Sequence, residues 1–286
     1  MTGARTGAEQ APADNGTRAA RRARPGGETH AGRIAGYAAA VAIVLALFGA
    51  WELYAALGSV DPLLLPAPHE VGEALYDDHA LLWDSFTVTA GEVLLGIVVA
   101  GAAGFACAVA LHLSLALRRS VYPLLVASQT IPIPVIAALL VVWLGFDLAP
   151  KLVIIGLVAF FPIAVTTLDA LARVDPELIK LMRTLDASRL RILRHVELPA
   201  ALPGLFTGAK VGVAVAVIGA VFAEQAGSSA GLGHLIQQAI PQLLTARAYA
   251  AVLILSAFAI ALFGLLTLAE RLVVPWAHDP PGGTNR

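Results

Sequence analysis

The sequence predicts an all-α protein that crosses a membrane several times. Hydrophobic residue types make up 58% of the 286 residues and charged types only 14%, whereas ordinary soluble domains carry roughly 25% charged residues. A soluble fold of this length could not cover its surface with so few charges. The composition therefore excludes a disordered chain, a disulfide-rich secreted domain and an ordinary cytosolic domain. The one cysteine, Cys107, lies in an apolar run and is expected to be a small buried hydrophobic residue.

Six nearly charge-free segments are candidates for membrane-spanning helices, which need about 20 apolar residues. In chain order these segments are residues 34–51, 93–117, 120–146, 152–168, 199–223 and 248–269. A further run, residues 226–244, contains glutamines, serines, glycines and Pro241. It predicts a short interfacial or re-entrant helix between loops.

These segments divide the chain into a core and its flanks. Residues 1–33 are rich in Gly, Ala and Arg without apolar periodicity, which predicts a disordered cytoplasmic tail. Residues 34–57 are expected to form the first transmembrane helix, and residues 58–83 an external loop. A membrane core follows at residues 84–276 and includes a cytoplasmic loop at residues 174–199. Residues 277–286 are expected to form a C-terminal tail.

The basic residues predict the orientation of the spans. When both termini are placed in the cytoplasm, all of the 19 basic residues except Lys151 and Arg247 fall on the cytoplasmic side or at the inner ends of spans. This distribution is the one that the positive-inside rule describes. The 58–83 loop carries acidic residues and neither Lys nor Arg. The sequence therefore predicts six spans with cytoplasmic N- and C-termini.

The 174–199 loop begins with the signals of a short helix. Asp175 is expected to cap it, because Pro176 suits the first helical position and Glu177 suits the positive end of the helix dipole. The helix should end near Leu185, where Asp186 is expected to turn the chain.

A second short helix is expected in the same loop. Ser188 is suited to cap it, and it should continue to about Val196. The pairs Leu198-Pro199 and Leu202-Pro203 are then expected to break the chain before the fifth span. Apolar residues alternate here with arginines, which suits docking to a partner protein and also suits anchoring on anionic lipid. The residues alone leave both interpretations open.

The loop resembles the cytoplasmic loop of ABC importer permeases, whose signature is E-A-A, three residues, Gly, nine residues and I-x-L-P. Lys180-Leu181-Met182 stand where E-A-A is expected, Asp186 stands at the Gly, and Val196-Glu197-Leu198-Pro199 stand at I-x-L-P. The Glu has become Lys, the small pair has become Leu-Met, and the turn Gly has become Asp. Asp tolerates left-handed backbone better than most residues do.

The resemblance extends over residues 64–276 and is closest to the branch that imports nitrate, sulfonates, taurine and pyrimidine precursors. The motifs that carry it, besides the loop, are L-P-A-P-H-E-V at residues 65–71, Q-T-I-P at 129–132, W-L-G-F at 143–146 and A-E-Q-A-G-S-S-A-G-L-G at 223–233. The Gly-Ser-Ser-x-Gly-Leu-Gly stretch is more similar to the members that import pyrimidine precursors of thiamine.

This resemblance implies the membrane-spanning subunit of an ATP-driven importer, with the type I permease architecture, in a bacterial cytoplasmic membrane. The implied partners are two copies of an ABC ATPase subunit, a second copy of the permease, the lipid bilayer and a periplasmic or lipid-anchored solute-binding protein. Neither nucleic acid nor a cofactor is implied. The sequence has no G-x-x-x-x-G-K-[ST] motif, so ATP hydrolysis is expected in a partner and the chain is not expected to be an enzyme. A secondary transporter or channel that acts without an ATPase is the alternative, although it would need intramembrane charges for ion coupling.

Two sets of site residues follow from the resemblance. The residues expected to couple to the ATPase are Asp175, Glu177, Lys180, Leu181, Met182, Arg183, Leu185, Asp186, Ser188, Val196, Leu198 and Pro199. The candidate solute-path residues are Gln129, Thr130, Glu224, Gln225, Ser228 and Ser229. A pair on the external surface stays open for Glu224 and Gln225, and hydrogen bonds between helices stay open for Gln129 and Thr130.

Other polar residues in the apolar segments have simpler interpretations. Glu92 is expected near the outer interface, whereas Asp169 and Lys210 are expected to pair or to reach the inner interface. The Gly-x-Ser-x-Gly pattern at residues 227–231 is interpreted as a glycine-rich turn, because no strand precedes it as a nucleophile elbow requires. Scattered histidines and a single cysteine predict no metal site.

The predicted topology can be tested by labelling single cysteines from either side of the membrane. A cysteine placed at Asp78 should react with an impermeant reagent added outside. A cysteine placed at Ser188 should react only from inside. Labelling of the Asp78 position from inside alone would contradict this topology.

Overall fold

The structure is a computed structural model that describes residues 30–58, 61 and 63–277, without the side chains of residues 30–37 and 40. Most of the predicted N-terminal tail and residues 278–286 lie outside the described residues. The first helix, α1 (His30–Ala56), begins within the last residues of that predicted tail. It runs from one compact unit, which ends at Ala50, into a second unit, which starts at Trp51.

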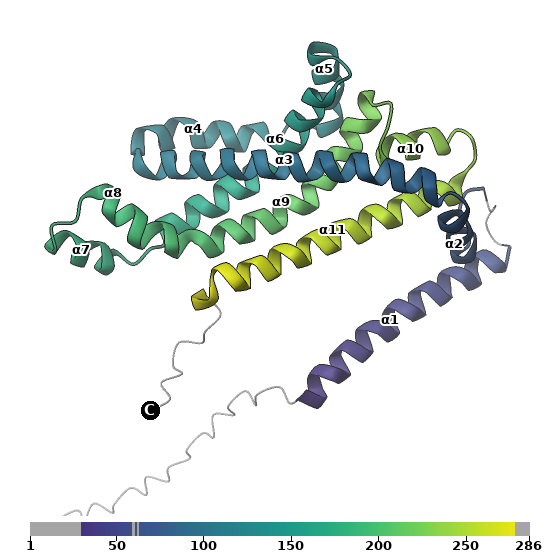
Figure 1. The fold of residues 1–286 in the computed structure, drawn as a ribbon, viewed down its shortest axis with the longest axis horizontal. Coiled ribbons are helices and arrows are strands. Elements are labelled where there is room, and N and C mark those ends of the chain that lie inside the picture. Colours follow the sequence, from purple (N-terminus) through teal and green to yellow (C-terminus); the bar gives the residue numbers. More distant parts are fainter. Residues whose placement is uncertain (1–29, 59–60, 62, 278–286) are drawn as a thin grey trace, which may run out of the picture. The chain divides into compact units, whose positions relative to one another are not determined.

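The described residues of the second unit form helices joined by loops, without any β-strand, which confirms the all-α prediction (Figure 1). Its helices after α1 are α2 (Pro68–Asp77), α3 (His79–Leu113), α4 (Leu115–Ser128), α5 (Ile133–Leu144), α6 (Leu148–Ala172), α7 (Pro176–Thr184), α8 (Arg189–Ile192), the π-helical turn η1 (Leu193–Glu197), α9 (Leu198–Gly227), α10 (Leu232–Ala239), α11 (Thr245–Val273) and the 3₁₀ turn η2 (Pro275–Ala277). The short helices α7 and α8 lie at one end of the bundle, and α2 and α10 lie at the other (Figure 1).

Four stretches in the described residues are long and apolar enough to cross a membrane. They are α3, α6, the continuous stretch Arg189–Gly227 and α11. If α4 and α5 are counted together as one broken span, there is a fifth, although the chain bends by 98° between the two helices. In α1 the stretch counted among described residues is Val41–Ala56, which is shorter than a span. A sixth span therefore stays a prediction.

The third predicted segment, residues 120–146, is not one straight helix. Pro132 is the N-cap of α5, in an extended conformation, and Pro134 lies in the first turn. Proline has no N–H to donate and keeps the residue before it out of helical geometry, so the chain bends between α4 and α5. The second predicted segment also differs, because α3 begins at His79 rather than at Val93.

The predicted break at the two prolines of the fifth span is wrong. Pro199 lies in the first turn of α9, where its missing N–H costs nothing, and Pro203 lies inside a helix that continues to Gly227. The irregularity comes one turn earlier, in η1. The short helix predicted within residues 226–244 is confirmed as α10.

Helices α6 and α9 pack along one another through small residues. A Cβ atom added to Gly208 of α9 would lie 2.8 Å from the Ile163 Cα atom and 2.9 Å from the Pro162 carbonyl oxygen of α6. Gly204 and Gly212 face the same helix. Small residues allow backbones to approach closely in membrane proteins, where helix association relies on packing. This contact holds the centre of the bundle.

We predict that Gly208→Ala destabilises the protein by about 1–3 kcal/mol, because the added methyl group meets backbone atoms that cannot move without separating α6 and α9. Gly156→Ala on α6 is the matched control, since a Cβ there meets nothing within 4 Å. Thermal unfolding of the detergent-solubilised protein measures both. Equal transition temperatures for the two variants would contradict this account of the packing.

Candidate functional site

The first helix and the turn of the 174–199 loop fold as the sequence predicts, whereas the second helix, predicted to reach about Val196, ends at Ile192 and gives way to η1. The Asp175 Oδ1 atom accepts a hydrogen bond from the Glu177 N–H at 2.8 Å and so caps α7, with Pro176 at its first position. The helix ends at Thr184. Asp186 has φ 53°, the left-handed conformation that the family's turn glycine suggested. The Ser188 Oγ atom accepts from the Arg191 N–H at 3.4 Å at the start of α8.

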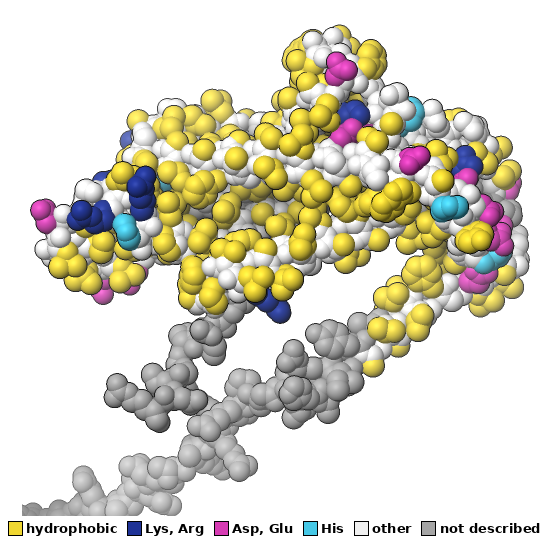
Figure 2. Space-filling view, in the orientation of Figure 1, with side chains coloured by type: hydrophobic (Ala, Val, Ile, Leu, Met, Phe, Trp, Pro, Cys, Tyr) yellow, Lys and Arg dark blue, Asp and Glu magenta, His cyan; other side chains and the backbone are white. Residues whose placement is uncertain are grey.

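Several of the predicted coupling residues form an exposed apolar surface. Leu181 on α7 and Leu185, which directly follows it, are 55% and 68% exposed, and Leu190 on α8 is 54% exposed, while Met182 is half-buried. Figure 2 shows Lys and Arg side chains beside hydrophobic ones at this end of the molecule. These basic side chains, all exposed, belong to Lys180, Arg183, Arg189, Arg191 and Arg194. The surface thus combines apolar side chains with positive charge.

The remaining coupling candidates lie deeper. Val196, Leu198 and Pro199 are half-buried where η1 continues into α9. Beside them Glu197 is only 1% exposed, and its Oε1 atom accepts from the Arg189 guanidinium at 2.6 Å. The Glu197 Oε2 atom lies 3.2 Å from His112 Nε2, at the end of α3. Glu197 stands at the variable position x of the I-x-L-P motif, so the motif gives no signal of its role in the packing.

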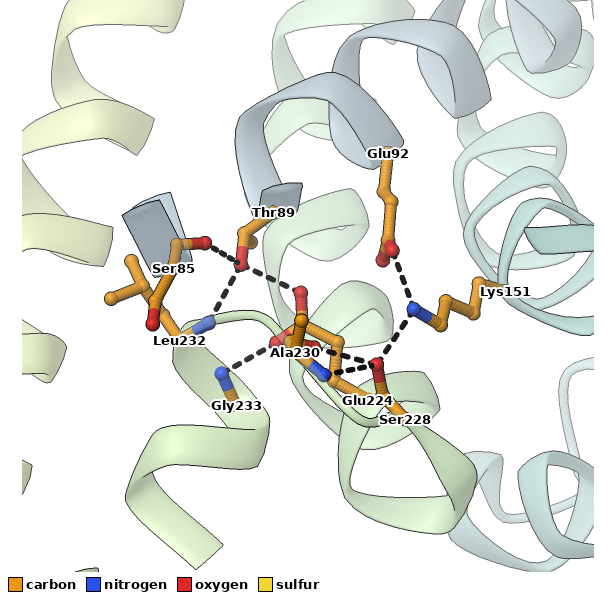
Figure 3. Close-up of polar contacts among 9 residues, drawn as sticks. All are labelled: Ser85, Thr89, Glu92, Lys151, Glu224, Ser228, Ala230, Leu232 and Gly233. Atoms are coloured by element: carbon orange, nitrogen blue, oxygen red, sulfur yellow. Dashed lines mark hydrogen bonds and ion pairs between the residues drawn. The ribbon is translucent and has the colours of Figure 1, made fainter. Parts of the chain in front are cut away.

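A buried polar cluster lies toward the opposite end of the bundle (Figure 3). Glu224 of α9 is fully buried. Its Oε1 atom accepts from the Thr89 hydroxyl at 2.6 Å, and its Oε2 atom accepts from the Gly233 N–H at 2.5 Å. The Thr89 Oγ1 atom in turn accepts from the Leu232 N–H at 2.8 Å. One carboxylate therefore joins α3, α9 and the start of α10.

The Glu224 carboxylate explains two glycines of the 223–233 motif. A Cβ atom at Gly231 would overlap the carboxyl group, and one at Gly233 would lie 2.8 Å from Glu224 Oε2. Gly231 also has φ 108°, which side chains rarely allow. The turn between α9 and α10 thus needs glycine both for its backbone shape and for the carboxylate against it. This turn is the glycine-rich turn predicted from the Gly-x-Ser-x-Gly pattern.

A buried ion pair extends this cluster to α6. Lys151 Nζ lies 2.6 Å from Glu92 Oε1 and donates to Ser228 Oγ at 2.7 Å. The Ser228 hydroxyl donates to the Ala230 carbonyl oxygen at 2.6 Å. Together Glu92 and Lys151 fix the first residues of the α9–α10 turn, as Glu224 fixes its last ones (Figure 3).

These contacts bear on several expectations about single charges. Glu92 is buried in an ion pair with Lys151, and its expected place near the outer interface stays a prediction. Glu224 is no member of a surface pair. Lys210 Nζ pairs with Glu270 Oε2 at 2.8 Å rather than with Asp169. Asp169 instead lines a cavity of about 520 Å³ between α6, α7 and α9. Placing an unpaired charge inside a span costs several kcal/mol of free energy. The charged residues in the apolar segments therefore indicated already in the sequence that each has a partner.

The other solute-path candidates fall into two places. Gln129 and Thr130 are exposed at the bend between α4 and α5. Their described bonds stay local, since Gln129 Nε2 contacts the Ser128 hydroxyl at 3.4 Å and the Thr130 hydroxyl donates to the Ala127 carbonyl at 2.8 Å. Both interpretations of these two residues, a place on the solute path and hydrogen bonds between helices, stay predictions. At the end of α9, Gln225 and Ser228 are half-buried and Ser229 is exposed.

Residues 93–276 match the family described as the inner membrane component of binding-protein-dependent transport systems. The chain belongs to this family. It is 37% identical, over 77% of its length and 90% of the relative's, to a probable ABC transporter permease protein of Haemophilus influenzae. It is 30% identical, over 81% of its length and 93% of the relative's, to the formylaminopyrimidine transport permease protein ThiX of Halalkalibacterium halodurans. A crystal structure of an amino acid ABC transporter shares the fold, with a TM-score of 0.55 at 14% identity over 71% of this chain and 96% of that one.

The family assigns the general role of the chain. It is a multi-pass inner-membrane permease subunit of an ABC importer, and ATP hydrolysis belongs to a partner subunit. The resemblance stated from the sequence motifs is therefore confirmed at the level of the family. The match covers the 174–199 loop and the α6, α9 and α10 residues of the buried polar cluster, while Thr89 and Glu92 lie just before it.

We predict that Lys151→Met destabilises the permease by about 3–5 kcal/mol, because it leaves the Glu92 carboxylate buried without its partner. The double variant Glu92→Leu with Lys151→Met should recover most of this loss, since it removes both charges. Thermal unfolding in detergent compares the variants. A double variant no more stable than Lys151→Met alone would show that the ion pair is not the source of the loss.

Proposed function

We propose that the permease docks its ATPase subunit through the 174–199 loop. The observation that supports this best is the exposed apolar surface of α7, framed by basic side chains at one end of the bundle. Lipid anchoring would also use such a surface, yet it would not need a capped helix, a left-handed turn and a second capped helix. These devices fix the direction of α7, as a protein contact requires.

The assembly proposed around this contact has two permease copies and two ATPase subunits. Closed two-fold symmetry is the most common arrangement for such assemblies. A periplasmic or lipid-anchored solute-binding protein would meet the opposite end, formed by α2 and α10. ATP and the loaded binding protein must then favour the same state of the permease, because coupling between two sites requires a shared change in equilibrium.

Three ion pairs agree with the sides to which the proposed topology assigns these residues, because in each pair both partners fall on the same side. Arg247 forms two hydrogen bonds with the Asp78 carboxylate, at 2.6 and 2.8 Å, and both residues fall outside in the predicted topology. Lys210 and Glu270 fall together at the inner side, as do Arg189 and Glu197. We therefore retain six spans with both termini in the cytoplasm of a bacterium as the proposed topology.

For the solute path, we propose that Gln129, Thr130, Gln225, Ser228 and Ser229 contact the solute as it passes. Glu224 would not contact the solute itself. Its buried carboxylate would instead hold the turn that carries Ser228 and Ser229 in place. Uncharged hydrogen-bonding side chains of this kind suit a polar solute that must not be bound tightly.

The charges in the spans favour an uncharged heterocycle over an anion as the solute. Lys151 and Lys210 are the lysines of the spanning helices, and each is paired with a glutamate in the same chain. Their positive charge is therefore balanced before any solute arrives. We propose a pyrimidine-type precursor as the solute, while a sulfonate, nitrate or taurine-like anion remains the second candidate from the branch resemblance.

Docking predicts that Leu185→Asp releases the ATPase. Burying a charge in an apolar contact without a partner costs several kcal/mol, and each 1.4 kcal/mol lowers affinity about tenfold. Met182→Asp should have the same effect. Co-purification of the ATPase with the permease measures the loss, together with ATP hydrolysis in reconstituted vesicles.

Thr184→Asp is the matched control, because it adds the same charge to the same exposed end of α7. It should retain more of the ATPase than Leu185→Asp does. Unchanged co-purification and unchanged hydrolysis for both Leu185→Asp and Met182→Asp would overturn the docking proposal.

The solute proposal predicts which compound stimulates the reconstituted transporter. With its binding protein present, formylaminopyrimidine should raise ATP hydrolysis and an aliphatic sulfonate should not. Gln225→Ala and Gln129→Ala should lower this uptake while the assembly remains intact. Stimulation by the sulfonate alone would reject the heterocycle, and normal uptake by both variants would reject the path assignment.

A further inference from the structure

Glu197, Arg189 and His112 form a closed triangle of charged and polar atoms at the base of the 174–199 loop. Besides the two contacts of the Glu197 carboxylate, Arg189 Nη2 lies 3.0 Å from His112 Nε2. Each residue therefore contacts the other two. They come from three different places, which are the end of α3, the start of α8 and the last residue of η1.

The backbone is irregular where α8 is joined to α9. Between α8 and α9 the chain forms a π-helical turn, in which the Leu198 N–H bonds the Leu193 carbonyl. Such turns are rare and interrupt the regular α-helical pattern, often at functional positions. The triangle braces this irregular junction from the side, with a carboxylate that is almost completely buried.

Helix α3 connects this triangle with the buried cluster at the opposite end. His112 lies in its last turn, while Thr89 and Glu92 lie toward its first half and hold the α9–α10 turn. At about 1.5 Å per residue, Thr89 and His112 are roughly 35 Å apart along the helix. One continuous helix thus carries polar anchors for both ends of the bundle.

We propose that Glu197 is a positioning residue that makes the 174–199 loop move together with α3. Movement of the loop during the ATP cycle then reaches the α9–α10 turn through a single helix. This inference rests on the proposed docking of the ATPase by the loop. It adds that docking and transmission use different residues, namely the exposed apolar face of α7 for docking and the triangle around the buried Glu197 for transmission.

The test uses the permease with its ATPase subunit in lipid vesicles. A fluorophore is attached to a cysteine at the exposed Ala230 position of the α9–α10 turn, in a Cys107→Ser background. The signal is the fluorescence change on adding ATP with vanadate, so no solute is required. The variants are Glu197→Gln, Arg189→Gln and the double variant. Arg119→Gln is the matched control, because it removes an exposed arginine charge from α4, outside the docking surface.

The expected result is a loss of transmission without a loss of binding. Glu197→Gln and Arg189→Gln should lower the fluorescence change about tenfold, whereas Arg119→Gln should leave it unchanged. The ATPase should still co-purify with all of them. The double variant should lose no more than either single variant, because both remove one shared contact.

Two results would overturn the inference. One is an unchanged fluorescence signal in both Glu197→Gln and Arg189→Gln with the ATPase bound. The other is loss of the ATPase in these variants, which would make the triangle part of docking. If Glu197→Gln fails to fold, Arg189→Gln decides, because the Arg189 side chain is 44% exposed. Failure of the docking proposal itself is recognised separately, as retention of the ATPase by Leu185→Asp and Met182→Asp.

Discussion

A charge placed inside a membrane span has to find its partner within the protein, since the lipid provides none. This constraint fixes much of how the permease is put together. Lys151 is satisfied by Glu92 and Ser228, and Lys210 by Glu270. Each pair joins helices that are distant in sequence, so each also sets the rotation and depth of one helix against another. Apolar packing by itself would leave those quantities less well defined.

The same constraint explains why the polar groups collect at the two ends of the second unit. Near α10, the cluster around Glu224 shapes a turn that the backbone could not adopt without glycine. Near α8, Glu197 closes a junction where the helix pattern changes. Between them the α6–α9 contact is made from small residues and contains few polar groups. The permease therefore has a close-packed centre and a polar cluster at each end.

Local features were predictable from the sequence because their causes are local. The cap at Asp175, the turn at Asp186 and the cap at Ser188 depend on residues only a few positions apart. The partner of Lys210 was not predictable in this way, because spacing along the chain does not fix which faces of two spans meet. The bend between α4 and α5 had its signal in Pro132 and Pro134, but a search for charge-free segments does not register proline.

The α9–α10 turn also has a consequence for how this sequence can change over time. The Glu224 carboxylate occupies the space that side chains at positions 231 and 233 would need, and it bonds the backbone which those glycines leave open. The three positions therefore form one inherited unit rather than three independent ones. A lineage that gained a side chain at Gly231 first would lose the site for the carboxylate, and one that lost Glu224 first would leave a void and an unbonded N–H. Substitution at these positions is thus expected to be concerted, because each intermediate step is unfavourable.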